Sequence, residues 1–206
     1  MKQILHLTSP MPPSVNHYTA TRCVIKNGRP LSIVYKTKES VSYQSEFKKT
    51  VISAIREQGW QTDINSPKHF YVDADFYMDK KGKDANNYWK CLLDAITETQ
   101  LVWKDDDIVC ERVNQIVYDS QSPRVELHIY HVDYIGIFDN DEQLKNFQTN
   151  NCVDCKRYKR NCALLRNAIE GRVQEEIDGY VCTKCTSLPQ TDAEVQCKFS
   201  HEELFE

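Results

Sequence analysis

The stretch "GKDANNYWKCLLDAITETQLVWKDDDIV", residues 82–109, places oxygen-rich side chains at both ends of an expected helix. An acid and two amides open it, and three consecutive aspartates close it. Because Leu92, Leu93 and Ile96 recur at helical spacing, we expect a helix at about 87–98. Crowded carboxylates repel one another, which costs free energy unless a cation or a solvated turn relieves it. A cation site and a solvated turn are therefore the two interpretations of this pattern.

The sequence around this stretch predicts a compact α+β domain, with a small mixed sheet and packed helices, that ends near Asp133. The expected elements are a strand at 3–7, an extended Pro-rich loop at 8–22 that forms a site wall, a helix at 37–58, a strand at 69–78, and a hairpin of two strands at 108–119 and 124–132. Strict alternation in the strand at 69–78 puts Asp73 and Asp75 on its open face. Period four puts Lys90 and Asp94 on one side of the central helix.

The composition bears on where the protein is located and on the state of its cysteines. The 206 residues carry a net charge of -4, but residues 1–133 have 17 basic and 17 acidic side chains, so the acidity lies in the rest of the chain. No run of 18 apolar residues is present, and the first residues lack the apolar core of a signal peptide. We therefore expect a cytoplasmic location, where the nine cysteines would stay reduced.

Three segments resemble, in the same order, the RusA-type Holliday junction resolvases. "PMPPSVNHY" (10–18) is similar to that family's N-terminal Pro-rich loop, "DANNYWKCLLDAI" (84–96) to the start of its catalytic helix, and "VWKDDDIV" (102–109) to the segment before a strand. The resemblance covers about residues 1–133. It implies a small homodimeric, Mg²⁺- or Mn²⁺-dependent endonuclease of DNA recombination and repair, often encoded by prophages, that cuts branched DNA.

The resemblance also implies roles for individual residues. Asp84 matches the first catalytic aspartate, Lys90 the catalytic lysine, and Asp106 the later aspartate, with Asp105 beside it. Asn86 stands where the family has a second aspartate; an amide oxygen ligates Mg²⁺ but adds no negative charge and cannot serve as a base.

We assign Asp84, Asp105 and Asp106 to the metal and Lys90 to the scissile phosphate. Asp75 and Asp107 are alternatives for the missing charge. A helix salt bridge with Asp94 is the plainer interpretation of Lys90. The expected DNA contacts are Lys80, Lys81, Lys83 and Asn16, and a solvated loop is the plainer interpretation of the three lysines.

Because of Asn86, a second class of function stays open. In this alternative the chain is a noncatalytic protein that binds junctions or other nucleic acid, with a degenerate active site.

Beyond an expected linker at 134–151, residues 152–206 contain two Cys-x-x-Cys pairs, Cys152 with Cys155 and Cys182 with Cys185. Two such pairs complete a tetrahedral Cys₄ zinc site of the structural type. A segment this short has little apolar material, so a bound Zn²⁺ would contribute much of its folding free energy.

An iron–sulfur cluster that uses Cys162 with three of those thiols is an alternative, and Cys197 with His201 offers another pair. Between the two Cys-x-x-Cys pairs, a run of basic residues precedes an expected amphipathic helix that includes Leu165 and Val173. We expect either DNA contact or a solvated face for that basic run.

Overall fold

The computed structural model describes residues 3–61 and 63–185, and the chain divides into two compact units after Val132. We describe each unit by itself. Within the described residues, no helix has the length and apolarity needed to cross a bilayer.

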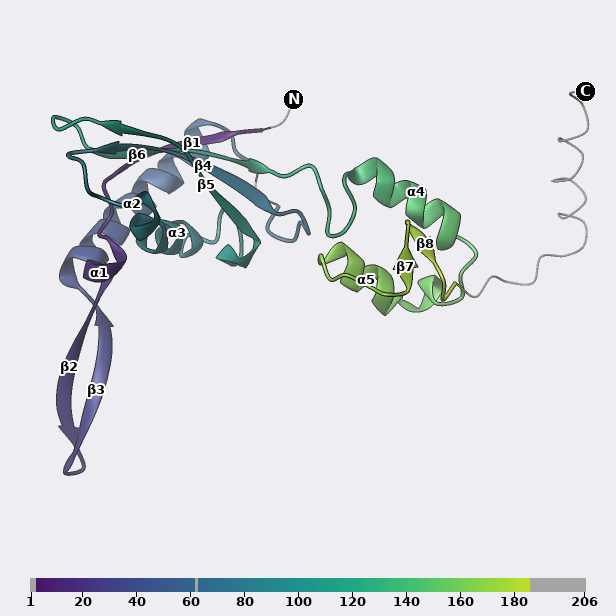
Figure 1. Ribbon diagram of the computed structural model, residues 1–206, viewed down its shortest axis with the longest axis horizontal. Helices are drawn as coiled ribbons and strands as arrows, with labels where there is room; N and C mark the ends of the chain where they lie inside the picture. Colours follow the sequence, from purple (N-terminus) through teal and green to yellow (C-terminus); the bar gives the residue numbers. More distant parts are fainter. Residues whose placement is uncertain (1–2, 62, 186–206) are drawn as a thin grey trace, which may run out of the picture. The chain divides into compact units, whose positions relative to one another are not determined.

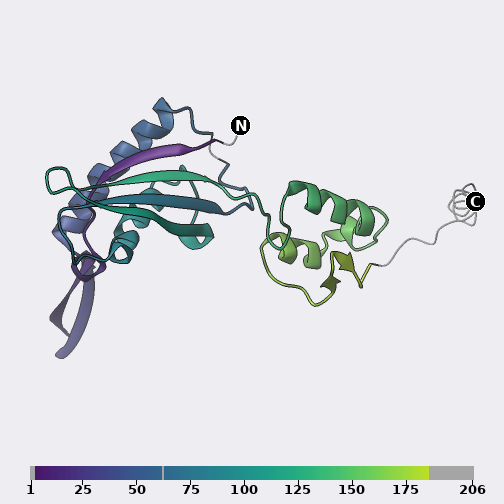
Figure 2. The ribbon, with the colours of Figure 1, turned by 45° about the horizontal axis from the view of Figure 1, so that its top comes forward.

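The first unit is built on a four-stranded mixed sheet (Figure 1). Its strands are β1 (Leu5–Pro10), β4 (Phe70–Met78), β5 (Val109–Tyr118) and β6 (Arg124–His131), and their order in space is β1-β6-β4-β5 (Figure 2). Residues of β4 that alternate along the strand are buried on the core face. β4 lies between β6 and β5, so it is an interior strand of the sheet.

The expected hairpin between the last two strands is wrong. β6 pairs with β1 and β4, and β5 pairs in parallel with β4 on its other side. The chain leaves β4, forms the short 3₁₀ helix η1 (Ala85–Tyr88) and helix α3 (Trp89–Thr97), and returns through η2 (Asp106–Ile108) to β5. This is a β-α-β crossover, which places β5 beside β4 and leaves the opposite edge of β4 to β6.

Two helices cover one face of this sheet. Helix α2 (Lys38–Glu57) begins where the Thr37 side chain accepts the N–H of Ser40, and it ends before Gly59, whose φ of 62° suits a helix C-terminus. The core between these helices and the sheet includes Phe47 and Val51 of α2, Leu92 and Ile96 of α3, and Phe70, Phe76 and Leu127 of the sheet. The helices expected at 37–58 and 87–98 are thus present with nearly the expected limits.

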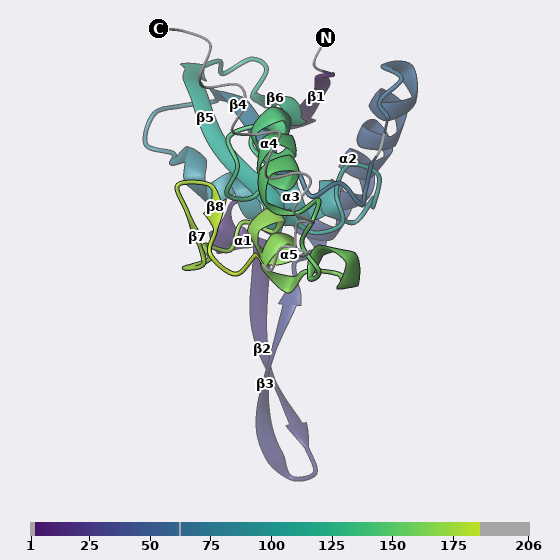
Figure 3. The ribbon, with the colours of Figure 1, turned by 90° about the vertical axis from the view of Figure 1, so that its right-hand side faces the viewer.

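The Pro-rich loop is shorter than expected. After Ser14 the chain forms one turn of helix, α1 (Val15–Tyr18), and then a two-stranded antiparallel ribbon of β2 (Thr19–Lys26) and β3 (Arg29–Lys36). Its tip is Asn27–Gly28, both with positive φ, as a tight primed turn requires. We call residues 19–36 the arm, because it projects from α1 away from the sheet (Figure 3).

The second unit contains α4 (Asp141–Asn151), a 3₁₀ turn η3 (Tyr158–Arg160), α5 (Ala163–Ile169), and the two-residue strands β7 (Ile177–Asp178) and β8 (Val181–Cys182). Most of the interval 134–151 is therefore helical, and Phe147 of α4 lies in this unit's small core with Phe138. Helix α5 ends earlier than its apolar pattern predicts, which leaves Val173 87% exposed.

Gly136 allows two segments of this unit to pack closely together. Its φ is 57°, and a Cβ built there would lie 1.9 Å from the carbonyl oxygen of Ala168. The segment before α4 can pack against the end of α5 only because residue 136 has no side chain.

Candidate functional site

The start of the α3 region is fixed by a side-chain cap and by buried aromatic rings. The carboxylate of Asp84 accepts the backbone N–H of Asn86 at 3.0 Å, which begins η1. Tyr88 and Trp89 are buried, and the Trp89 ring meets Phe76 of β4 edge-on at 5.7 Å. This anchoring leaves Asp84 and Asn86 exposed in front of the helix.

Lys90 is held by a chain of polar contacts that begins at α1. Its ammonium lies 2.7 Å from Oδ1 of Asp94, and Tyr18 donates its hydroxyl to Oδ2 of the same carboxylate. The Gln44 amide of α2 in turn donates to the Tyr18 oxygen at 3.3 Å. Burial and the contact with Asp94 raise the pKa of Tyr18, so its hydroxyl keeps its proton. The ion pair that the spacing allowed for Lys90 is therefore present.

Asp106 adds a carboxylate to this group from the other end of the crossover. Burial raises the pKa of Asp106, and so do Asp94 and a hydrogen bond with Asp105, whereas Lys90 opposes them. Burial together with the charge of Asp106 likewise raises the pKa of Glu111 at the start of β5. Lys90 is thus the cation beside Asp94 and Asp106, while burial and neighbouring carboxylates disfavour the charged forms of Asp106 and Glu111.

The structure separates Asp75 from this group. In β4, Asp75 lies on the face opposite the buried apolar side chains, is 7% exposed, and accepts the Asn114 amide at 2.7 Å. Glu111 pairs with Val72 in the parallel ladder and so shares the helix-covered face. A carboxylate on one face of a sheet cannot share an ion with one on the other, so we leave Asp75 out of the site.

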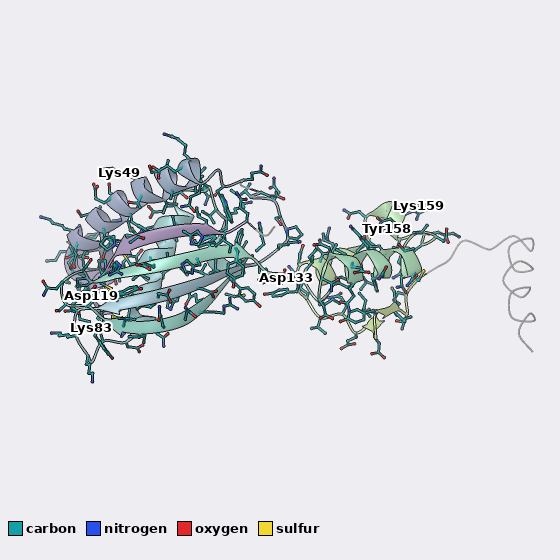
Figure 4. The ribbon with its side chains drawn as sticks, turned by 90° about the horizontal axis from the view of Figure 1, so that it is seen from above. Lys49, Lys83, Asp119, Asp133, Tyr158 and Lys159 are labelled. Carbon is teal, nitrogen blue, oxygen red and sulfur yellow. The ribbon has the colours of Figure 1, made fainter. Side chains whose placement is uncertain are left out.

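The lysines expected to contact DNA lie in the loop between β4 and η1. Lys83 pairs with Asp79 at 2.6 Å, Lys81 lies over the Tyr118 ring, and Lys80 is exposed. Lys83 and Asp119 lie at the same end of the sheet (Figure 4). Asn16 is exposed on α1.

The side chains at this site fit a divalent cation only in part. Within residues 3–61 and 63–185, no three His, Cys, Asp or Glu side chains are arranged as a ready ligand set. The Asp105–Asp106 pair nevertheless brings two carboxyl groups together, and burial raises the pKa of Asp106. Oxygen donors under such repulsion fit a hard divalent cation, and Asp84 and Asn86 supply further oxygens at the start of η1.

The sequence motifs did not reveal that Tyr18 supports this site or that Glu111 lies near Asp106. The contact from Tyr18 to Asp94 joins residues 76 positions apart. Tyr18 lies within the Pro-rich motif, so that motif was the signal for it. The alternating pattern of β5 was the corresponding signal for Glu111.

The thiols of the second unit gather around its core. Cys152 and Cys155 are buried, and Cys152, Cys155, Cys162 and Cys182 line an enclosed cavity of about 10 Å³. Burial and the neighbouring thiols raise the pKa of Cys152 to about 11. Cys185 shares a hydrogen bond with Cys155 and donates its thiol to the Asn151 carbonyl at 3.0 Å. Cys197 and His201 fall outside the described residues.

Comparison with known proteins finds a family match within the first unit. Residues 10–130 match the family described as Endodeoxyribonuclease RusA, a span that includes α1, the arm, the crossover and Lys90. A search of curated proteins found no match. The match ends before the thiol-rich unit. Since it covers more than half of the sequence, the chain belongs to the RusA endodeoxyribonuclease family.

Proposed function

We propose that this protein is a Mg²⁺-dependent, structure-selective endonuclease that resolves Holliday junctions or related branched DNA in recombination and repair. Family membership carries the DNA-cleaving activity. The observation that supports the site is the position of the Lys90 ammonium, which pairs with Asp94, interacts with Asp106 and is held by a contact reaching back to Tyr18.

The proposed roles follow from charge. A divalent cation bound there supplies a Lewis acid for the phosphodiester and lowers the pKa of an attacking water. Asp105 and Asp106 hold that cation, with Asp84 and the Asn86 amide as oxygen donors from η1. Lys90 points its charge at the scissile phosphate and stabilises negative charge that develops there. Asp94 and Tyr18 are positioning residues, because they act by holding the Lys90 side chain.

Asn86 makes the ligand set less negative than three aspartates would be. We propose that the site works with this weaker donor, at a higher Mg²⁺ concentration than a site with aspartate would need. The competing function is a noncatalytic junction-binding protein, in which the site has lost the charge needed to hold the ion.

A four-way junction presents two symmetry-related strands to be cut. We therefore include a two-fold homodimer in the proposal, with one site in each subunit. Phosphate contacts from Lys80, Lys81 and Lys83 and a contact from Asn16 would place the backbone beside Lys90. Such contacts position DNA without reading its sequence.

Cleavage of a synthetic four-way junction tests the proposal. We expect paired nicks near the branch point with Mg²⁺, no nicks without it, and little cutting of a linear duplex of the same sequence. Asp84→Asn should abolish cutting. A wild type that binds the junction but never cuts it would establish the noncatalytic alternative.

A further inference from the structure

The described thiols of the second unit form a cluster that the nuclease site does not use. The two Cys-x-x-Cys turns have the same local geometry: the N–H of Cys155 donates to the Cys152 carbonyl at 3.0 Å, and the N–H of Cys185 to the Cys182 carbonyl at 3.4 Å. Such turns put both thiols of a pair on one side. Asn151, which directly precedes Cys152 in the chain, holds the second pair close to the first, because it accepts the N–H of Cys182 and the thiol of Cys185.

We propose that Cys152, Cys155, Cys182 and Cys185 bind one Zn²⁺ as a structural site. The small cavity here is lined by Cys152, Cys155 and Cys182 and not by Cys185, and the described thiols are not arranged as a ready ligand set, so Zn²⁺ binding would draw the two pairs together. The unit's core is small, with Phe138, Phe147, Leu165 and Ala168 among its few buried apolar residues, so metal binding would contribute much of its folding free energy. Cys162 also lines the cavity and is assigned no ligand role.

Metal analysis of the full chain, purified without chelator, tests this assignment. We expect one Zn²⁺ per chain, and Co²⁺ substitution should give the intense thiolate-to-cobalt absorption of four sulfur ligands. Cys155→Ser should weaken metal binding by at least about tenfold, whereas Cys162→Ser should not change it. Absence of zinc, bound iron with sulfide, or loss of metal in Cys162→Ser but not in Cys185→Ser would overturn the proposal.

A second feature, the arm, carries an independent inference about DNA. Residues 19–36 contain no acidic side chain. Arg22, Lys26 and Arg29 are exposed, and none of the three forms an ion pair among the residues that the structure describes. Lys36, at the base of the arm, is neutralised instead by Glu98 at 2.9 Å. The charge that remains unpaired therefore lies beyond the base, toward the tip.

The register of the ribbon puts these three cations on one face. Arg22 pairs with Ile33, and Lys26 with Arg29, while residues directly opposite each other share a face. Tyr35 lies on that face too, with the Arg22 guanidinium 5.4 Å from its ring centre, and Val24, Leu31 and Ile33 share the same face. The other face carries Thr21, Cys23, Ile25, Ser32 and Val34 and has no charge before Lys36. One side of the arm is therefore basic and the other is neutral.

The position of the arm relates this basic face to the active site. The arm begins directly after Tyr18, which holds Asp94 and hence Lys90. Eight extended residues reach about 25 Å from this point, and a two-stranded ribbon fits the width of a DNA major groove. Ile25 and Val34 are 80% and 66% exposed on the neutral face, so the described residues of the first unit leave the ribbon uncovered there.

We infer that the basic face of the arm binds the phosphate backbone of a DNA branch next to the cleavage point. This inference rests on the proposed action on branched DNA. A polyanion is the partner that a face with three unpaired cations, an aromatic ring and no acid fits by charge. A second copy of this chain would match the neutral face instead, where Ile25 and Val34 are exposed.

Binding of a labelled four-way junction, followed by anisotropy without added Mg²⁺, tests the inference. We expect Lys26→Gln/Arg29→Gln to weaken binding about 10- to 100-fold near 0.1 M salt and to reduce the salt slope by about two. The matched control is Lys49→Gln/Arg56→Gln, which removes one lysine and one arginine from exposed positions on α2. Figure 4 shows Lys49 on this helix. Equal weakening by both double variants, or by neither, would overturn the inference.

A third variant separates DNA from a protein partner. Ile25→Thr/Val34→Thr changes only the neutral face, so we expect junction affinity within about twofold of wild type. If this variant instead changes the sedimentation coefficient while the basic-face variant leaves DNA binding intact, the arm contacts another copy and the inference fails. If the wild type cuts the junction but the basic-face variant binds it as tightly as the wild type does, only the arm proposal is refuted. If the basic-face variant binds the junction more weakly but the wild type does not cut it, only the nuclease proposal is refuted.

Discussion

The Lys90 ammonium lies 2.7 Å from Oδ1 of Asp94, one turn further along α3. Tyr18 donates to the other oxygen of that carboxylate, so Asp94 cannot turn away from Lys90 without losing a hydrogen bond. Asp106 acts on the same ammonium from η2. An ion pair between exposed helix residues is usually worth little, but here it fixes the direction of a charge at the proposed site.

Lys90 and Asp94 should therefore differ in how much cleavage depends on them. We expect Lys90→Met to lower the single-turnover cleavage rate by about 100- to 1000-fold, because a donor aimed at the phosphate is lost. Asp94→Asn should lower it by about tenfold, because only its positioning is lost. Lys49→Met is the control, since Lys49 forms a similar ion pair with Glu46 at 2.8 Å on α2. A Lys90→Met rate equal to the control would refute this role.

The charged Asp106 side chain should destabilise the folded protein when no cation is bound. Burial and neighbouring carboxyl groups raise its pKa, so its charge in the folded state is unfavourable above its unfolded pKa, and this cost disappears as the pH falls below that value. Asp106→Asn should therefore raise Tm by about 1–3 °C at pH 7 without divalent ions. Mg²⁺ should raise the Tm of the wild type and not of the variant. Calorimetry with and without Mg²⁺ distinguishes these outcomes.

Asn86 invites the opposite substitution. We expect Asn86→Asp to lower the Mg²⁺ concentration needed for half-maximal cleavage by at least about threefold, because a carboxylate adds charge to the ligand set. Asn87→Asp is the neighbouring control. An unchanged Mg²⁺ dependence in Asn86→Asp would mean that residue 86 does not contribute to holding the ion.

The open face of the sheet carries a separate stability prediction. Although burial opposes it, the hydrogen bonds from Arg112 and Tyr130 hold the pKa of Asp73 below its usual value. The Arg112 guanidinium donates to both carboxylate oxygens and lies 3.7 Å from the Tyr71 ring centre. Arg112→Met should lower the free energy of unfolding by about 1 kcal/mol at pH 7.

The pH dependence of that loss has a definite sign. Because the folded pKa of Asp73 is depressed, its stabilisation is fully present above the unfolded pKa of about 3.9 and is lost as pH falls toward the folded value. The difference between wild type and Arg112→Met in urea melts should therefore shrink below pH 4. A constant difference across this range would assign it to packing against Tyr71.

The local elements were predictable because their signals are local. Apolar spacing and the Thr37 cap give the helix Lys38–Glu57, and alternation gives the strand Phe70–Met78. The pairing of strands was not predictable, because adjacency of β5 and β6 in sequence favours a hairpin, whereas the α3 crossover puts β5 on the far side of β4. The arm was missed because its strands carry polar residues on both faces and have no core to face.

The candidate site was predictable as a set of residues and not as an arrangement. The motifs named Asp84, Lys90 and Asp106. Alternation placed Asp75 on the open face of its strand, but the motifs did not show that the site lies on the opposite, helix-covered face of the sheet. Nor did they show Tyr18 reaching Asp94, since a contact across 76 positions depends on the tertiary fold.

Cleavage of a four-way junction by the wild type and by Asp84→Asn, compared at saturating protein with and without Mg²⁺, tests the central claim most directly. We predict Mg²⁺-dependent paired nicks by the wild type and none by Asp84→Asn, with both proteins binding the junction equally to within about threefold. Cutting that persists undiminished in Asp84→Asn, or a wild type that binds but does not cut, would contradict the account.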